Sequence, residues 1–310
     1  MEIPKNVPTC DSESGMSRQT TIRDQDEFQE TRELVTSAFA LARALDIRSI
    51  LVQSDEITDR HLVENLRQAE RVIWIARDRN DIPASDPSKD VVLVMRDASL
   101  NRLSQLNLAL FLAALNGLVR SDERVLGLSG VTGSQRLDTL VIAKPARDYP
   151  WLQRHKADMA VSSHLARLLE IALQLARQGR EGSSIGTIFV LGNRDELSPY
   201  LRQLILNPLK GHPVEARSIH NPDLIESLRE LAAMDGGFVI DRSGIVESAA
   251  TYFDATIGPG RLRPGWGARH AAALAITVVT NATAVVISAS SGTVSVYDGG
   301  EIVLTLERAH

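Results

Sequence analysis

The chain has 310 residues, 44% of them hydrophobic, which is enough material for the cores of about two globular domains. Its 34 lysines and arginines are outnumbered by 39 aspartates and glutamates, and the formal charge of −5 gives no overall basic field for a nucleic acid or a membrane surface. Cys10 is the only cysteine, which excludes a disulfide framework and a cysteine zinc site within one chain and favours a reducing cytoplasm.

The N-terminal segment, residues 1–27, is rich in Ser, Thr, Pro and charged residues, and we predict that it is disordered. It lacks the basic region followed by an apolar region that marks a secretory signal. The richest apolar stretch, "LNLALFLAALNGLV", is shorter than the roughly 18 residues that a membrane-spanning helix needs. We therefore expect a soluble, cytoplasmic protein.

Residues 28–148 alternate amphipathic helical patterns with short β-branched runs. Helices are expected over "ETRELVTSAFALARALD", over "DRHLVENLRQAE" and from Leu106 to Leu118, and strands over "RSILVQS", "RVIWIARD", "KDVVLVMRD" and "DTLVIAKP". This alternation predicts an α/β layer domain with a largely parallel sheet. The segment "PARDYPWLQRHKAD" breaks the pattern with two prolines, so we place the domain boundary there, with residues 149–158 as a linker.

Residues 159–310 form the second predicted domain. It begins with an amphipathic helix that ends at Gly179, followed by the strand "GTIFVLG" and by helices over "SPYLRQLILNPL" and "NPDLIESLRELAAM". Two hairpins are expected where "DRSG" and "YDGGE" provide turn residues between strand-like runs, with an alanine-rich helix and the strand "ATAVVISAS" between the hairpins. The fold class is therefore α/β in both domains, with a mixed sheet in the second.

The first unusual motif is "AAMDGGFVI", in which Asp235, Gly236 and Gly237 lie between the end of a helix and the start of a strand. One interpretation is a plain turn, because Asp-Gly is a common turn dipeptide. The other is a carboxylate held where glycine lets a ligand approach the backbone, which suits a divalent metal beside phosphates. The motif alone leaves both open.

The second motif is "GWGARHAAALAI", in which Arg269 and His270 stand at the start of the alanine-rich helix. The first backbone N–H groups of a helix are unpaired and its dipole is positive there, so two cation-capable side chains would complete an anion site. The alternative is that Arg269 pairs with a carboxylate and His270 caps the helix. Together with Asp235, the anion interpretation predicts a site for a metal and a triphosphate. A P-loop and a dinucleotide-binding glycine motif are both absent.

With these two motifs the chain resembles the diadenylate cyclase domain, whose signatures are a DGA motif followed by an RHR motif. The correspondence continues in order from about Met159 to the C-terminus, through "LARQGREGSSIGTIFVLGN", "LILNPLKGHP" and "ATAVVISASSGTVSVYDGGEIV". The resemblance implies an enzyme that condenses two ATP molecules into cyclic di-AMP with release of pyrophosphate and uses Mg²⁺ or Mn²⁺. Because each site supplies one ATP, it also implies a homo-oligomer in which two domains face each other.

The resemblance also implies roles for individual residues. Asp235 would hold the metal or help to activate the attacking 3′-hydroxyl, and Arg269 and His270 would bind the phosphates and stabilise the leaving pyrophosphate. The remaining residues expected to contact the nucleotide are Gly236, Gly237, Gly267, Ala268 and Ser288.

The N-terminal half is similar to the C-terminal domain of pyruvate kinase, on the residues "RSILVQSDEITDRHLVENLRQAERVIWIARD" and "NGLVRSDERVLGLSGVTGSQRLDTLVIAKP". The same type of domain precedes the cyclase domain in archaeal-type soluble diadenylate cyclases. This similarity implies a regulatory or oligomerising domain that carries no catalytic residues.

Several positions depart from the cyclase pattern. DGA reads DGG, the residue often threonine is Ala268, and the second arginine of RHR is Ala271. The acidic residues that follow the strand-end serine in the family are Ala289 and Ser290 here. The nearest carboxylates in sequence that could replace them belong to Asp241, Glu247 and Asp254. A second hypothesis is therefore a weakly active or inactive sensor of adenine nucleotides.

Overall fold

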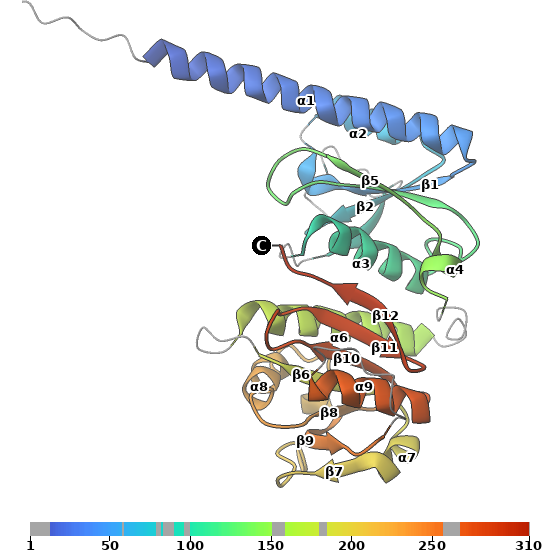
Figure 1. The fold of residues 1–310 in the computed structure, drawn as a ribbon, viewed down its shortest axis with the longest axis vertical. Coiled ribbons are helices and arrows are strands. Elements are labelled where there is room, and N and C mark those ends of the chain that lie inside the picture. Colours follow the sequence, from blue (N-terminus) through green and yellow to red (C-terminus); the bar gives the residue numbers. More distant parts are fainter. Residues whose placement is uncertain are drawn as a thin grey trace, which may run out of the picture.

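The computed structural model is an α/β protein with two separate β-sheets, stacked along the long axis with helices between them (Figure 1). The structure describes residues 13–57, 59–78, 82, 90–95, 100–150, 159–179, 185–256 and 267–309, without the side chains of residues 13–28 and 159–162. No helix in the described part of the chain is long and apolar enough to cross a membrane.

The N-terminal sheet has five strands in the order β3-β2-β1-β4-β5. The first four run parallel and only β5 is antiparallel, as the sequence predicts. Alternate residues of β1 face two different cores, with Ile50 and Val52 on one side and Leu51 on the other. The strand bounds are β1 (Ser49–Gln53), β2 (Arg71–Ala76), β3 (Val91–Val94), β4 (Val125–Ser129) and β5 (Thr139–Ala143).

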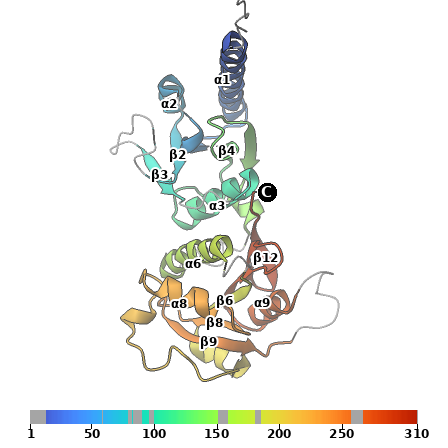
Figure 2. The ribbon, with the colours of Figure 1, turned by 90° about the vertical axis from the view of Figure 1, so that its left-hand side faces the viewer.

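Helices cover both faces of this sheet. The helices α1 (Glu13–Ala44) and α2 (Arg60–Leu66) lie on the outer face, and α3 (Arg102–Leu115) lies on the inner face toward the second sheet (Figures 1 and 2). The side chain of Asn101 caps α3 by accepting from the Ser104 amide at 2.9 Å. A short 3₁₀ turn, η1 (Ser54–Glu56), follows β1, and α4 (Pro145–Asp148) follows β5.

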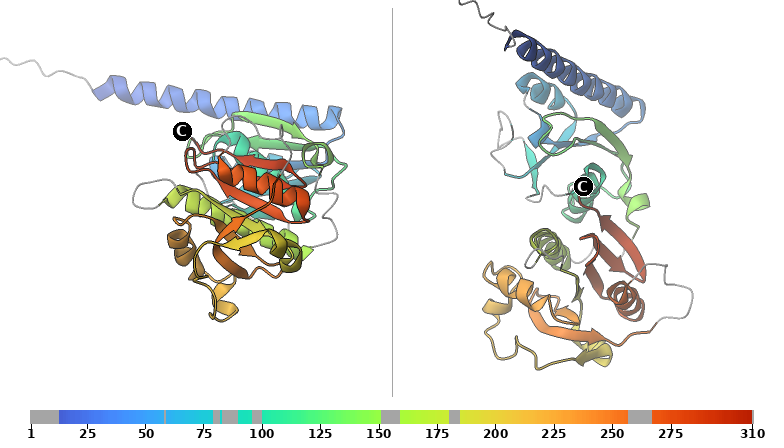
Figure 3. Two further views of the ribbon diagram at one scale, coloured as in Figure 1. Left: turned by 60° about the horizontal axis from the view of Figure 1, so that its bottom comes forward. Right: turned by 60° about the vertical axis from the view of Figure 1, so that its left-hand side comes forward.

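The start of α1 differs from the expected disordered tail. The helix begins at Glu13, so residues 13–27 are helical, while residues 1–12 lie outside the described residues. The N-terminal part of α1 projects past the edge of the sheet (Figure 1, and left view of Figure 3). Charged and polar residues dominate this part, which explains why its sequence shows no apolar face that would predict a packed helix.

The C-terminal sheet has seven strands in the order β12-β11-β10-β6-β8-β9-β7. Only β6 and β8 pair in parallel, and the other neighbours are antiparallel, which confirms the mixed sheet. The two predicted turns connect β8 to β9 and β11 to β12. The bounds are β6 (Thr187–Leu191), β7 (Leu201–Gln203), β8 (Gly237–Ile240), β9 (Val246–Phe253), β10 (Thr283–Ile287), β11 (Val294–Asp298) and β12 (Glu301–Leu306).

This sheet is also covered on both faces. The helix α6 (Met159–Gln178) packs on one face with α8 (Leu224–Leu231), and α9 (Ala268–Val279) packs on the other (Figure 2). The chain leaves α6 at Gly179, with φ of +58°, at the predicted end of the helix. The remaining short elements are α7 (Arg194–Leu197), η3 (Ser198–Tyr200) and η4 (Glu215–Arg217).

One predicted helix is wrong. Instead of a helix over "SPYLRQLILNPL", the structure has η3, the short strand β7 and a loop. Leu201 and Gln203 pair with the edge of β9, and the Leu204 amide donates to the Ala250 carbonyl at 3.1 Å. The apolar spacing of these residues fits a helix, but hydrogen bonds to an available sheet edge decide their conformation.

The two sheets are connected through α3, which contacts both α6 and β12. The Asn101 amide donates to the Glu307 carbonyl at 3.0 Å, and the Glu307 amide donates to Ser104 Oγ at 2.8 Å. The sheets fall on either side of the predicted linker, of which residues 151–158 lie outside the described residues. The domain limits 28–148 and 159–310 stay predictions.

Candidate functional site

A cavity of about 600 Å³ brings together the predicted motifs of the C-terminal domain. Every site residue proposed from the sequence lines it except Gly237. The turn before β8, the strand β9, the start of α9 and the end of β10 each contribute part of the wall. The polar and glycine residues of the lining are Asp235, Gly236, Thr251, Tyr252, Gly267, Arg269, His270, Ser288 and Ser290.

The two glycines after Asp235 have different structural roles. Gly236 lines the cavity with φ of +92°, and a Cβ at this position would lie 2.7 Å from the Thr251 carbonyl oxygen. Gly237 instead begins β8, where a Cβ would lie 2.4 Å from the Ile188 carbonyl oxygen. Gly236 therefore lets the backbone turn beside the cavity, while Gly237 lets β6 and β8 approach closely. The expected nucleotide contact of Gly237 is not supported by its position.

The helix α9 presents its N-terminus to the cavity. Its N-cap is Gly267, which has no side chain to satisfy the first backbone N–H groups. The His270 amide donates to the Gly267 carbonyl at 3.1 Å, whereas the amides of Ala268 and Arg269 have no acceptor within the described residues and can bind an anion. Arg269 is half-buried in the wall. It has no ion pair or hydrogen bond within the described part of the chain, so the alternative in which a carboxylate neutralises it is not found there.

His270 is held by a residue that sequence reasoning missed. Its Nδ1 lies 2.7 Å from the hydroxyl of Tyr297, which is fully buried in β11. Burial lowers the pKa of His270, so the imidazole is neutral at pH 7. The Tyr297 hydroxyl thus fixes the orientation of the ring through Nδ1. The interpretation of His270 as a helix cap is replaced by this contact between α9 and β11.

Asp235 is the one carboxylate among the described residues that line the cavity. Within the described residues, no group of three or more His, Cys, Asp and Glu side chains could hold a metal. A Mg²⁺ ion is commonly held by one or two carboxylates together with substrate phosphates and water. The cavity fits such an ion if it arrives with a triphosphate, and it does not offer a complete ligand set made of protein alone.

The three carboxylates suggested as replacements for the missing acidic pair all lie elsewhere. Asp241 Oδ1 accepts from the amides of Ser243 and Ile245, both at 2.9 Å, and closes the turn after β8. Glu247 lies 2.9 Å from Arg194, and Asp254 lies 3.7 Å from Arg202. None of the three belongs to the lining of the cavity. They stabilise local structure, so none of these three carboxylates replaces the expected acidic pair in the cavity.

The positions of that acidic pair, Ala289 and Ser290, are exposed at the rim, directly after β10. Ser290 Oγ lies 3.2 Å from Ser288 Oγ, so these two hydroxyls provide the polar groups of this side. The apolar side chains of the lining include Ile188, Phe253 and Val286. The lining thus combines charged and polar groups with apolar side chains, which suits a ligand with phosphates and a planar body.

Comparison with known proteins gives the class of the C-terminal domain. Residues 174–302 match the family described as "DAC: DisA bacterial checkpoint controller nucleotide-binding". This confirms the resemblance to the diadenylate cyclase domain for that part of the chain. Residues 30–144 match a second family, described as "Probable sensor domain DacZ_P". The similarity to the C-terminal domain of pyruvate kinase is not confirmed and stays a prediction.

Two curated relatives carry the name diadenylate cyclase. The protein of Methanocaldococcus jannaschii is 39% identical over 139 residues, which cover 45% of this chain and 44% of the relative. The protein of Haloferax volcanii is 33% identical over 159 residues, which cover 51% of this chain and 57% of the relative. The matched part therefore spans about half the length of each relative.

Two solved structures are also similar. One is a hypothetical membrane spanning protein from Bacillus cereus, with a TM-score of 0.36 and 19% identity, covering 50% of this chain and 72% of that one. The other is a double mutant of DacA from Staphylococcus aureus, with a TM-score of 0.34 and 21% identity, covering 45% of this chain and 84% of that one.

Proposed function

We propose that this protein is a diadenylate cyclase that condenses two ATP molecules into cyclic di-AMP and two pyrophosphates. The observation that carries the proposal is the convergence of Asp235, Arg269 and the N-terminus of α9 on one cavity. The cavity lies in a domain whose named relatives are diadenylate cyclases. Arg269 has no partner within the described residues and stands beside a positive helix terminus, an arrangement that favours an anion such as a triphosphate.

Each half of the reaction forms one phosphodiester bond. The oxygen of a 3′-hydroxyl attacks the α-phosphorus of the facing ATP, the bond to pyrophosphate breaks, and the hydroxyl proton is lost to a base. Asp235, as the carboxylate of the lining, is positioned to hold a metal ion or to help activate the hydroxyl. A divalent cation, Mg²⁺ or Mn²⁺, would neutralise charge on the triphosphate when bound.

The other residues bind and orient the phosphates. The guanidinium of Arg269 and the first amides of α9 bind the triphosphate and stabilise charge on the leaving pyrophosphate. When the Tyr297 hydroxyl donates to Nδ1 of His270, the proton of the neutral ring is on Nε2, and we propose that the ring in this orientation contributes to phosphate binding. Ser288, Gly267 and Ala268 also line the cavity, and we propose that they contact the nucleotide.

The reaction requires two copies of the chain. One cavity offers one set of phosphate ligands, so two cyclase domains face each other with one ATP each. We therefore propose a homo-oligomer assembled through residues 159–310. For the N-terminal domain, residues 28–148, we propose a regulatory role, which its match to a sensor family supports. The single cysteine supports a cytoplasmic location.

The experiment is a product assay. The purified chain is incubated with ATP and Mn²⁺ or Mg²⁺, and cyclic di-AMP is quantified by mass spectrometry. We expect product from the native chain, a loss of at least about a hundredfold in Asp235→Asn, and no change in Asp195→Asn, which removes an exposed carboxylate on α7. A folded native chain that yields no product above background contradicts the proposal.

A second candidate is an adenine-nucleotide sensor without turnover. It is favoured by the single carboxylate of the lining and by Ala271 and Ala289 at positions where the family has a cation and an acid. Calorimetry separates the two candidates. A sensor binds ATP and leaves it intact, and Asp235→Asn then changes only the affinity.

A further inference from the structure

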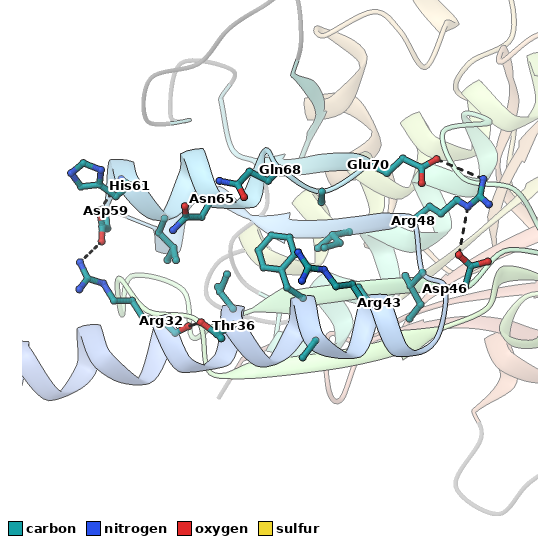
Figure 4. Close-up of a pocket in the computed structure, with 18 residues that line it drawn as sticks. Arg32, Thr36, Arg43, Asp46, Arg48, Asp59, His61, Asn65, Gln68 and Glu70 are labelled. Carbon is teal, nitrogen blue, oxygen red and sulfur yellow. Dashed lines mark hydrogen bonds and ion pairs between the residues drawn. The ribbon is translucent and has the colours of Figure 1, made fainter.

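A second and larger cavity lies in the N-terminal domain, far along the chain from the first. It measures about 910 Å³ and lies between α1 and α2, with the start of β1 as its floor (Figure 4). The volume falls within the range of roughly 300–1,000 Å³ that small-molecule sites occupy. Nothing in the proposed cyclase reaction uses this cavity.

Ion pairs stand at the two ends of the cavity (Figure 4). At one end Arg32 of α1 lies 2.8 Å from Asp59, the N-cap of α2, and this guanidinium lowers the pKa of the Asp59 carboxyl. At the other end Arg48 lies 3.7 Å from Glu70 and 3.9 Å from Asp46. All three carboxylates of the lining are thus already occupied by arginines.

The polar side chains in the middle of the cavity are exposed to solvent and have no protein partner within the described residues. Arg43 extends from α1 into the space between the helices, and Asn65 and Gln68 face it from the other wall (Figure 4). Within the described part of the chain, none of these three side chains makes a hydrogen bond or an ion pair. Arg43 is therefore the one arginine of the lining whose charge no described carboxylate balances.

Apolar side chains line the space around these polar groups. Val35, Ile50 and Leu62 are buried, with 2%, 1% and 6% of their surface exposed, and Phe39 is half-buried beside them. A cavity with an arginine that no described carboxylate balances, two amides and buried apolar side chains suits a ligand that carries both an anionic group and an apolar body.

We propose that this cavity binds a small organic anion, with its carboxylate or phosphate head on Arg43 and its apolar body against Phe39 and Leu62. The planar guanidinium forms paired hydrogen bonds with either kind of head. The amides of Asn65 and Gln68 hydrogen-bond to polar groups of the ligand and distinguish it from a plain fatty acid. This inference concerns binding alone and does not depend on the cyclase activity.

The test uses 8-anilinonaphthalene-1-sulfonate, an aromatic anion whose fluorescence rises in an apolar site. Every variant also carries Arg269→Gln, so that the arginine of the other cavity is removed throughout. Arg43→Gln is expected to raise the dissociation constant of the dye about tenfold. The matched control is Arg60→Gln, which removes an equal charge from an exposed residue of α2 outside the lining and leaves the constant unchanged.

A second variant tests whether the dye needs the space of the cavity, without changing the charge of Arg43. Ala40→Phe fills the space from an exposed position on α1 without changing any charge, and it is expected to abolish the fluorescence rise. Competition then tests whether the ligand must carry an anionic group. Benzoate should displace the dye, and benzyl alcohol, its neutral analogue, should not. If Arg43→Gln and Ala40→Phe bind the dye as Arg60→Gln does, or if the two competitors are equally effective, the proposal is wrong.

Discussion

Each of the two cavities contains an arginine that has no partner among the described residues, but the cavities are built in different ways. The cyclase-domain cavity depends on the backbone, because Gly236 adopts φ of +92° and the N-cap Gly267 has no side chain to accept from the first amides of α9. The N-terminal cavity depends on side chains from two helices, closed at its ends by ion pairs between arginines and carboxylates. A backbone site accepts few substitutions at its glycines, whereas a side-chain site can change its ligand by single substitutions.

Substitution of Gly236 should have the largest effect, because it tests whether the first cavity depends on its backbone. In Gly236→Ala the new Cβ meets the Thr251 carbonyl oxygen at 2.7 Å and the residue must keep φ of +92°. The control is Gly211→Ala, which has φ of +91° but nothing within 4 Å of the new Cβ. We expect Gly211→Ala to cost about 1–2 kcal/mol and Gly236→Ala a further 1–3 kcal/mol.

Urea unfolding and ATP titration together measure this difference. Gly236→Ala should also lose ATP binding, while Gly211→Ala should retain it. Equal unfolding midpoints and equal ATP affinities in the two variants would show that the turn at Gly236 is not required by the site.

A smaller effect is expected at Tyr297, which positions His270. In Tyr297→Phe the imidazole loses the hydroxyl 2.7 Å from its Nδ1, so both ring nitrogens can carry the proton. We expect kcat to fall about tenfold with little change in KM. Tyr200→Phe is the matched control, because the Tyr200 hydroxyl makes no hydrogen bond within the described residues.

Nitrogen NMR of His270 distinguishes a positioning role from a structural one. The native protein should show a neutral ring with its proton on Nε2 at pH 7, and Tyr297→Phe should show a mixture of both tautomers. An unchanged tautomer in the variant contradicts the role given to Tyr297.

The smallest effect concerns the pH dependence of stability. Burial lowers the pKa of His270 in the folded state, whereas the unfolded chain titrates near the ordinary value of about 6.5. As the pH falls below about 6.5, the unfolded state gains a proton before the folded state does, so the free energy of unfolding decreases. This contribution is fully present above pH 6.5 and is lost as the pH falls through the folded-state pKa.

His270→Gln should reduce that dependence. Burial also lowers the pKa of His220, so this variant retains part of the dependence of the free energy of unfolding on pH. Unfolding by urea at pH 7.5 and at pH 5.5 gives the comparison. The native chain should lose more stability between pH 7.5 and pH 5.5 than His270→Gln does. Equal losses would contradict the claim that burial of His270 contributes to the pH dependence of stability.

Much of the fold was predictable from local patterns. The alternation of helices and β-branched runs predicts the largely parallel first sheet, and the turn residues "DRSG" and "YDGGE" predict two hairpins of the second. Both depend on residues close in the chain. The strand β4 escaped prediction because "VLGLS" is short and contains Gly127, and β7 was mistaken for a helix because its pairing with β9 is not local.

In the cyclase-domain cavity, the predictable residues were those that belong to short continuous sequence motifs. Asp235 and Arg269 stand in short glycine-containing stretches, and the cavity brings these stretches together. Tyr297 was not predictable, because 27 residues separate it from His270 and a buried tyrosine in a strand is ordinary core. The N-terminal cavity was missed for the same reason: Arg43 and Asn65 belong to different helices whose packing no motif marks.

The central claim is that the cavity at the start of α9 binds a triphosphate through Arg269. The most direct measurement is calorimetric titration with 3′-deoxy-ATP and Mn²⁺, since this nucleotide lacks the attacking hydroxyl and cannot be condensed. We predict that the native chain binds one nucleotide per subunit, that Arg269→Gln binds it at least about tenfold more weakly, and that Arg60→Gln binds it unchanged. Equal affinity in Arg269→Gln and the native chain would contradict the account.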